Sequence, residues 1–294
     1  EQYLKRCMEC LLEQKEFLTE IILIDDGSTD SSSKICLDYS RKYANVIYLR
    51  QPNAGPGAAR ERGLRIASGK YICFVDSDDI VDINVIGKMV NYAEETKADI
   101  VSANIAYLDE TDSEMLETVS RLRIKPYEIY EVKKHPELIY LLRLFLWGKI
   151  YKKSLLINAN VTQPNHFYED TSVLPCIFST AETVFHVDEV VYKYYRGRVG
   201  NTTGNYFRLQ DLYLSMTEVM EYFHVNGKFE QYKLSLKILL NSQIRFLYRK
   251  LEKGLESQQI GQAYAQDLLE KMYQLMVDNF GSWLDTAKGK ITVA

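Results

Sequence analysis

The chain has 294 residues, of which 46% are hydrophobic and 26% charged, a balance that is typical of a folded globular protein. This length is enough for one large domain or for two smaller ones. Lys and Arg number 36 and Asp and Glu 40, which gives a formal net charge of −4, whereas nucleic-acid-binding proteins usually carry a basic excess. We therefore expect no nucleic-acid partner.

The apolar and cysteine patterns bear on location. The longest strongly apolar stretch, residues 138–147, is far shorter than the ~20 residues of a membrane-spanning helix. The five cysteines are an odd number without the spacing of a disulfide framework, which favours a reducing compartment. We predict a cytoplasmic protein.

The first third of the chain alternates between helical and strand patterns. Short apolar runs predict strands at 20–24, 45–49 and 70–75, and helical spacing of apolar residues predicts helices at 3–14, 31–43 and 58–67. This alternation is typical of a mostly parallel sheet with helices on both faces. Ligands of open α/β sheets bind beyond the carboxyl ends of the strands, so we expect functional side chains there.

Carboxylates follow two of these predicted strands. The first strand runs into Asp25 and Asp26, and the third runs into Asp76, Asp78 and Asp79. Clustered carboxylates repel one another unless a cation or hydrogen-bond donors neutralise them, and a hard divalent cation that also binds a diphosphate would do so. Asp, Gly and Ser are also ordinary turn residues, but two such clusters at two strand ends favour a functional site.

A Gly- and Pro-rich loop at 53–57 leads into the helix that contains Arg60. The first amides of that helix, together with the Arg60 guanidinium, suit an anionic ligand. Taken alone the loop is a common feature, and Arg60 suits a surface ion pair equally well.

The pattern changes near residue 205. Strand-like runs give way to apolar residues at helical spacing, so we predict an α/β domain at 1–204 and a helical subdomain at 205–294. The middle of the helical part is basic, which suits either a solvated face or contact with an anionic membrane surface; its basic residues are Lys237, Arg245, Arg249, Lys250 and Lys253.

Considered together, the motifs resemble those of the family 2 glycosyltransferases, an inverting family of the GT-A type. The resemblance extends over residues 1–204 and includes I-L-I-D-D-G-S-T-D at 22–30, F-V-D-S-D-D at 74–79, W-G-K-I-Y at 147–151 and Y-E-D-T at 168–171. It implies an α/β, Rossmann-like GT-A fold, whose mixed, mostly parallel sheet is flanked by helices, with a C-terminal helical subdomain. It also implies a first β-strand upstream of residue 1.

The resemblance further implies roles for individual residues on the donor side. Asp25, Asp26 and Arg60 would contact the nucleotide of a nucleotide-sugar donor. Asp76 would lie near the ribose and, with Asp78, would hold Mn²⁺ or Mg²⁺ at the diphosphate. Four residues near the end of the domain would close on the diphosphate, namely Arg196, Arg198, Thr202 and Thr203.

On the acceptor side, the resemblance implies that Asp170 is the catalytic base and that Glu169 supports it. A sugar hydroxyl is a very weak acid, so its attack requires a carboxylate that takes the proton as the new bond forms. By themselves, Glu169 and Asp170 also suit the first turn of a helix, where negative charge is favourable.

The activity implied by this resemblance is inverting, metal-dependent transfer of a sugar from a UDP-sugar to a hydroxyl of a saccharide or lipid-linked acceptor. The setting would be bacterial capsular, exopolysaccharide or cell-surface glycan synthesis, with peripheral contact at the inner face of the membrane. Two alternatives stay open. One is a haloacid-dehalogenase-like phosphotransferase, although Ile80 stands where that family needs Thr or Val. The other is a nucleotide-sugar-binding module without catalysis.

Overall fold

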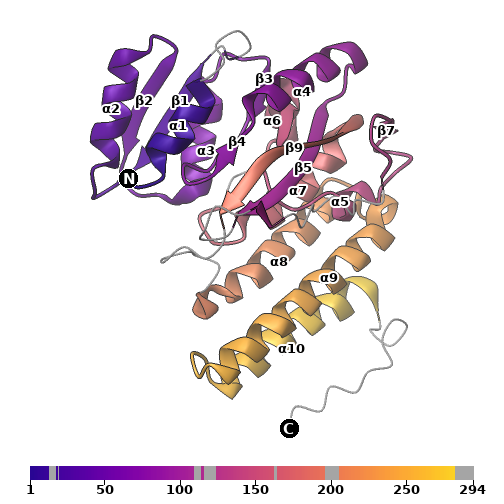
Figure 1. Ribbon diagram of the computed structural model, residues 1–294. Helices are drawn as coiled ribbons and strands as arrows, with labels where there is room; N and C mark the ends of the chain where they lie inside the picture. Colours follow the sequence, from indigo (N-terminus) through magenta and orange to yellow (C-terminus); the bar gives the residue numbers. More distant parts are fainter. Residues whose placement is uncertain are drawn as a thin grey trace. The chain divides into compact units, whose positions relative to one another are not determined.

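The computed structural model describes residues 1–12, 18, 20–108, 114–115, 124–161, 164–195 and 205–281 (Figure 1). The chain divides into two compact units, Glu1–Asn201 and Thr202–Ala294. The first contains the strands and the second is helical where it is described.

The first unit begins with α1 (Leu4–Leu12) and a small parallel sheet. This sheet pairs β1 (Ile21–Asp26) with β2 (Val46–Gln51), and α2 (Ser32–Lys42) and α3 (Gly55–Ile66) pack against it. These elements lie where the hydrophobic patterns predict them. Helix α3, however, begins at Gly55 rather than at residue 58, because proline is well tolerated in a first helical turn, where backbone amides have no intrahelical partner.

A second, mixed sheet forms the centre of the unit, with the strand order β3-β8-β5-β9-β4. Its strands are β3 (Tyr71–Cys73), β4 (Ile80–Val81), β5 (Ile100–Leu108), β6 (Glu114–Met115), β7 (Ile129–Glu131), β8 (Lys149–Lys152) and β9 (Thr183–Tyr195). The short strands β6 and β7 lie outside this order and pair with β5 and β9. Within the described residues, only β5 and β9 are parallel in this sheet. Parallel neighbours need long crossovers, and the regular strand–helix alternation of the first third does not continue beyond it. The sheet is therefore less parallel than that alternation predicts.

Helices cover this central sheet. Helix α4 (Ile83–Thr96) packs against β5, β8 and β9, and it buries Met89 and Ala93 completely. Helix α7 (Glu169–Thr180) packs against α5 (Leu138–Leu141) and α6 (Lys153–Ala159). Residues 171–179 of α7 are all buried. This burial anchors the first turn of α7, which carries Glu169 and Asp170.

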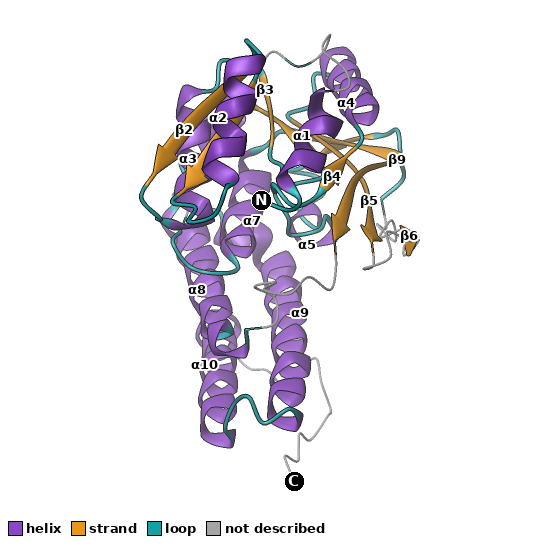
Figure 2. Cartoon of the chain, turned by 60° about the vertical axis from the view of Figure 1, so that its left-hand side comes forward, coloured by secondary structure: helices purple, strands orange, loops and turns teal. Residues whose placement is uncertain are grey.

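Over its described residues, 205–281, the second unit consists of three long helices after a short 3₁₀ turn at Tyr206–Arg208. They are α8 (Gln210–Val225), α9 (Phe229–Glu256) and α10 (Gln262–Phe280), and each packs against the other two (Figure 2). Over the ranges that the structure describes, no helix has both the length and the apolar character needed to cross a membrane.

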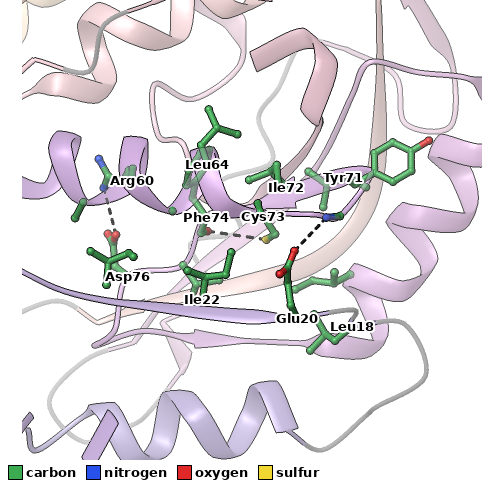
Figure 3. Close-up of a pocket in the computed structure, with 18 of the residues that line it drawn as sticks. Leu18, Glu20, Ile22, Arg60, Leu64, Tyr71, Ile72, Cys73, Phe74 and Asp76 are labelled. Atoms are coloured by element: carbon green, nitrogen blue, oxygen red, sulfur yellow. Dashed lines mark hydrogen bonds and ion pairs between the residues drawn. The ribbon is translucent and has the colours of Figure 1, made fainter. Parts of the chain in front are cut away.

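A cavity of about 620 Å³ separates β1 from β3 (Figure 3). Apolar side chains from both strands line it, including Ile22, Ile24 and Ile72, and helices α3 and α4 contribute Leu64 and Val90. Among the described strands, β1 pairs only with β2, and β3 pairs only with β8. Each strand therefore turns an edge toward the cavity, and we propose that the cavity accommodates one further strand.

Extension of the chain ahead of Glu1 by about ten residues that include an apolar strand tests this proposal. A strand in the cavity would pair with both edges and bury apolar side chains, so we expect Tm to rise by roughly 5 °C or more. Differential scanning calorimetry measures the change. The matched control is the same extension with Pro at the centre of the strand, where a missing N–H prevents pairing. Equal Tm values for the two extended chains would contradict the proposal.

Candidate functional site

Arg60 joins three carboxylates that lie far apart in the sequence. Its Nη1 donates to Glu169 Oε1 at 2.6 Å and to Asp170 Oδ1 at 3.1 Å, and its Nη2 donates to Asp76 Oδ1 at 3.3 Å (Figure 3 shows the contact with Asp76). Helix α3 supplies the arginine, the segment after β3 supplies Asp76, and the first turn of α7 supplies the other two. We call these four residues the Arg60 cluster.

The cluster is open on one side. The side chains of Arg60 and Glu169 are each 13% exposed and that of Asp170 is 14% exposed, whereas Asp76 is 37% exposed. Burial opposes the charge of Arg60, but the carboxylates around it hold its pKa above the usual value. The guanidinium therefore stays charged, and a ligand would reach the cluster from the Asp76 side.

Asp170 has the environment of a general base. Burial raises its pKa to about 7; Glu169 and Asp76 add to the rise, and Arg60 opposes it. Its two oxygens have different partners, since Oδ1 accepts from Arg60 and Oδ2 accepts from the Leu146 amide at 3.2 Å. A base works best when its pKa lies near the working pH, so this carboxyl group is suited to proton transfer at neutral pH.

Asp25 is buried and hydrogen-bonded to surrounding residues of the protein. It is 5% exposed, and it accepts hydrogen bonds from the Ser28 amide at 2.8 Å, from Tyr48 Oη at 3.0 Å and from Ser33 Oγ. Against the effect of burial, the hydrogen bonds from these residues lower the pKa of Asp25 to about 2. Asp25 thus holds the end of β1 together.

Asp26 fixes the start of the helix that carries Arg60. Its carboxylate accepts from the amides of Ala54 at 2.9 Å and Gly55 at 2.8 Å, and from Gln51 Nε2 at 2.8 Å. The next residue, Gly27, has φ +79°, and a Cβ there would lie 2.8 Å from the backbone nitrogen of Asn53. The D-D-G sequence therefore places the loop before α3, and with it Arg60.

The D-S-D-D segment after β3 divides its carboxylates between the surface and the interior. Asp76 and Asp78 line the cavity between β1 and β3. Asp79 is 1% exposed, and it accepts from Tyr192 Oη at 2.8 Å and from the Tyr195 amide at 3.1 Å, while burial raises its pKa to about 7. Tyr192 Oη also accepts from the Asp76 amide at 3.1 Å. Asp79 and Tyr192 thereby fix the turn that presents Asp76.

The donor atoms near this turn suit a hard divalent cation. Asp76 and Asp78 offer carboxylate oxygens, the ligands that Mg²⁺ and Mn²⁺ prefer. Among the residues that the structure describes, no group of three or more His, Cys, Asp and Glu side chains is arranged to hold a metal by itself. A cation held by Asp76 and Asp78 would need further ligands from a bound molecule.

The structure brings together part of the set predicted from sequence. Arg60, Asp76, Glu169 and Asp170 meet directly. Asp25 and Asp26 instead accept hydrogen bonds from α2, from β2 and from the neighbouring loops. The four residues expected at the diphosphate lie outside the described residues; they are Arg196, Arg198, Thr202 and Thr203.

Sequence reasoning missed two buried side chains of β8, Lys149 and Tyr151, which hold the loop next to Asp170. Lys149 Nζ donates to the carbonyls of Arg143 and Phe145, and Tyr151 Oη donates to that of Leu146. The lysine within the apolar W-G-K-I-Y run could have indicated this role, because a buried amine needs specific hydrogen-bond partners.

Comparison with known sequences identifies relatives. Residues 1–146 match the model described as Glycosyl transferase family 2. Glycosyltransferase GlyG of Streptococcus pneumoniae is 31% identical over 205 residues, which are 66% of this chain and 67% of that protein. The uncharacterized glycosyltransferase EpsJ of Bacillus subtilis is 31% identical over 201 residues, 66% of this chain and 57% of EpsJ. Glycosyltransferase GlyA of S. pneumoniae is 30% identical over 202 residues, 66% of this chain and 29% of GlyA. The chain thus spans less than two thirds of both EpsJ and GlyA.

Comparison with solved structures concerns the fold. TarS residues 1–349 from S. aureus, solved in complex with UDP, superposes with a TM-score of 0.68 at 19% identity, and the match covers 93% of this chain and 77% of the TarS chain. This likeness confirms the mixed α/β fold with C-terminal helices. The fold, the match of residues 1–146 and the identity to GlyG together show that this chain belongs to glycosyltransferase family 2.

Proposed function

We propose that this chain is an inverting, metal-dependent glycosyltransferase that transfers a sugar from a UDP-sugar to a hydroxyl of a saccharide or lipid-linked acceptor. The observation that carries the proposal is the Arg60 cluster. It joins Asp170, a carboxyl group whose pKa suits a base, to Asp76 of the acidic segment after β3. A catalytic base and a diphosphate site are the two parts that sugar transfer requires.

In this mechanism Asp170 accepts the proton of the acceptor hydroxyl as the hydroxyl oxygen attacks the anomeric carbon. The bond between that carbon and the diphosphate oxygen breaks, and the anomeric configuration inverts because the attack comes from the opposite face. The leaving nucleoside diphosphate gains negative charge. Arg60, next to Asp76, places a fixed positive charge close to the donor side of the reaction.

The residues proposed to hold the divalent cation are Asp78 and Asp76. When bound, Mn²⁺ or Mg²⁺ would supply charge neutralisation at the departing diphosphate. Two proteins of similar fold support the use of a divalent cation, since GalNAc-T7 and the mannosyltransferase PcManGT of Pyrobaculum calidifontis were solved with Mn²⁺, with TM-scores of 0.51 and 0.54. The oxygen chemistry of the two aspartates agrees with it.

The substrate class rests on the relatives. TarS was solved with UDP-GlcNAc as well as UDP, and a poly(ribitol-phosphate) beta-glucosyltransferase of Bacillus spizizenii is 32% identical over 173 residues, 56% of this chain and 25% of that protein. We therefore propose hexosyl or N-acetylhexosaminyl transfer in the synthesis of a bacterial surface glycan.

We place the reaction in the cytoplasm, with peripheral contact at the inner face of the membrane. None of the five cysteines, all of which lie within the described residues, forms a disulfide, which agrees with a reducing compartment. Helix α9 exposes Arg245, Arg249 and Lys253, basic side chains that suit an anionic lipid surface carrying a lipid-linked acceptor.

Substitution Asp170→Asn tests the base. The amide keeps the size of the side chain but does not accept the proton, so we expect transfer to fall by roughly 100-fold or more while donor affinity stays unchanged. Release of UDP reports transfer, and calorimetry reports donor binding. Glu61→Gln is the matched control, because Glu61 adjoins Arg60 in α3 and pairs with Arg65 on the surface. Unchanged transfer in Asp170→Asn would exclude Asp170 as the base.

The pH dependence of kcat/KM should follow the ionisation of Asp170. Below about pH 7 the carboxyl group is protonated and does not act as a base, so activity should fall by about tenfold per pH unit on the acidic side. Because Glu169 raises the pKa of Asp170, Glu169→Gln should move this acidic limb to lower pH. A limb that stays in place in Glu169→Gln would contradict the assignment.

Substitution Asp78→Ala tests the cation site. Loss of one carboxylate should weaken the Mn²⁺-dependent part of UDP binding by roughly tenfold or more. Calorimetric titration of UDP with and without Mn²⁺ measures that part. Ser77→Ala, between the two aspartates, is the control and should keep the metal effect. An equal Mn²⁺ effect in Asp78→Ala and the wild type would show that Asp78 is not a ligand.

A further inference from the structure

Two side chains of β8 fix the backbone of the loop between α5 and β8. Lys149 Nζ donates to the carbonyl oxygen of Arg143 at 3.0 Å and to that of Phe145 at 2.7 Å. Tyr151 Oη donates to the carbonyl oxygen of Leu146 at 2.9 Å. Lys149 is 4% exposed and Tyr151 is fully buried. The loop is therefore held from the sheet through three of its carbonyl groups.

The same loop contacts the proposed base. The Leu146 amide donates to Asp170 Oδ2 at 3.2 Å, and Leu146 is fully buried. The carbonyl groups on either side of this amide are both held: Lys149 donates to the carbonyl of Phe145, and Tyr151 donates to the carbonyl of Leu146. The two β8 side chains therefore hold the backbone on both sides of the amide that contacts Asp170.

Packing alone does not account for a lysine at this place. A buried amine is costly unless hydrogen bonds replace its lost hydration, and an apolar side chain would fill the same space at lower cost. Burial lowers the pKa of Lys149 to about 7, while the negative charge of Asp170 favours its protonated form. The neutral amine keeps two N–H donors, so both carbonyl contacts persist in either protonation state.

We propose that Lys149 and Tyr151 are positioning residues for the base: they hold the loop so that the Leu146 amide orients the carboxylate of Asp170 toward the acceptor hydroxyl. This proposal rests on the proposed function, since it requires Asp170 to be the base. Catalytic side chains must be held within about 0.5 Å of the productive geometry, which gives such a support a direct effect on rate.

Lys149→Met tests the proposal, because methionine has a comparable length and no hydrogen-bond donor. We expect kcat to fall by roughly tenfold to 100-fold with the KM for the donor within about twofold of the wild type, since the donor side is untouched. Tyr151→Phe removes only the hydroxyl and should lower kcat in the same way. Lys152→Met is the matched control, because Lys152 lies on the same strand, is 37% exposed and pairs with Asp99.

The pH profile distinguishes positioning from a general loss of structure. The charged groups facing Asp170 are Arg60 from α3, Asp76 after β3, Glu169 on α7 and Lys149 on β8. Both the Leu146 amide and a protonated Lys149 favour the ionised carboxylate. Lys149→Met should therefore move the acidic limb of kcat/KM to higher pH, and Tyr151→Phe should move it in the same direction.

Two outcomes would overturn the proposal. One is a wild-type kcat and an unmoved acidic limb in both Lys149→Met and Tyr151→Phe. The other is a fall in kcat that is matched by the same loss of donor affinity. If Lys149→Met does not fold, Tyr151→Phe decides the question. The Asp170→Asn variant distinguishes failure of this proposal from failure of the proposed base. If Asp170→Asn is inactive while the β8 variants behave as wild type, only the positioning proposal fails. If Asp170→Asn is active, the proposed base itself fails.

Discussion

The ion pairs of Arg60 join parts of the first unit that the chain keeps far apart. One guanidinium reaches Asp76 after β3 and two carboxylates at the start of α7. Without the positive charge, three carboxylates in so small a space would repel one another. With it, the acidic end of the sheet and the first turn of α7 form one site.

The rest of the unit explains how this arginine is held in place. Asp26 at the end of β1 accepts from the first amides of α3, so the strand end sets the start of the helix, and Arg60 lies in the second turn of that helix. Helix α7 is buried along nearly its whole length and packs against α5 and α6, which keeps its first turn fixed. The fold thus determines the distance between the donor side and the base, and small changes in that distance have large effects on rate.

Much of the local structure could be predicted from sequence, because it depends on neighbours along the chain. The strand that ends at Asp26 and the helix that carries Arg60 follow from apolar periodicity and from Gly and Pro. The extent of parallel pairing was overestimated, since β3 pairs antiparallel with β8, a strand that lies far along the sequence. Periodicity reports which face of an element is buried, but it carries no information on its distant partner.

The sequence alone determined the family motifs, the helical character of the last third and the residue types that sugar transfer needs, because each is a property of short segments. The tertiary structure decided which of these residues meet. Asp25 is identical in type to Asp76, but it is enclosed by hydrogen bonds from its own loop, from α2 and from β2, whereas Asp76 faces Arg60. Lys149 and Tyr151 become relevant only because β8 lies beside the loop that contacts Asp170. The physical reason is that burial and charge pairing, which set the ionisation of each group, depend on distances in space that spacing along the chain does not record.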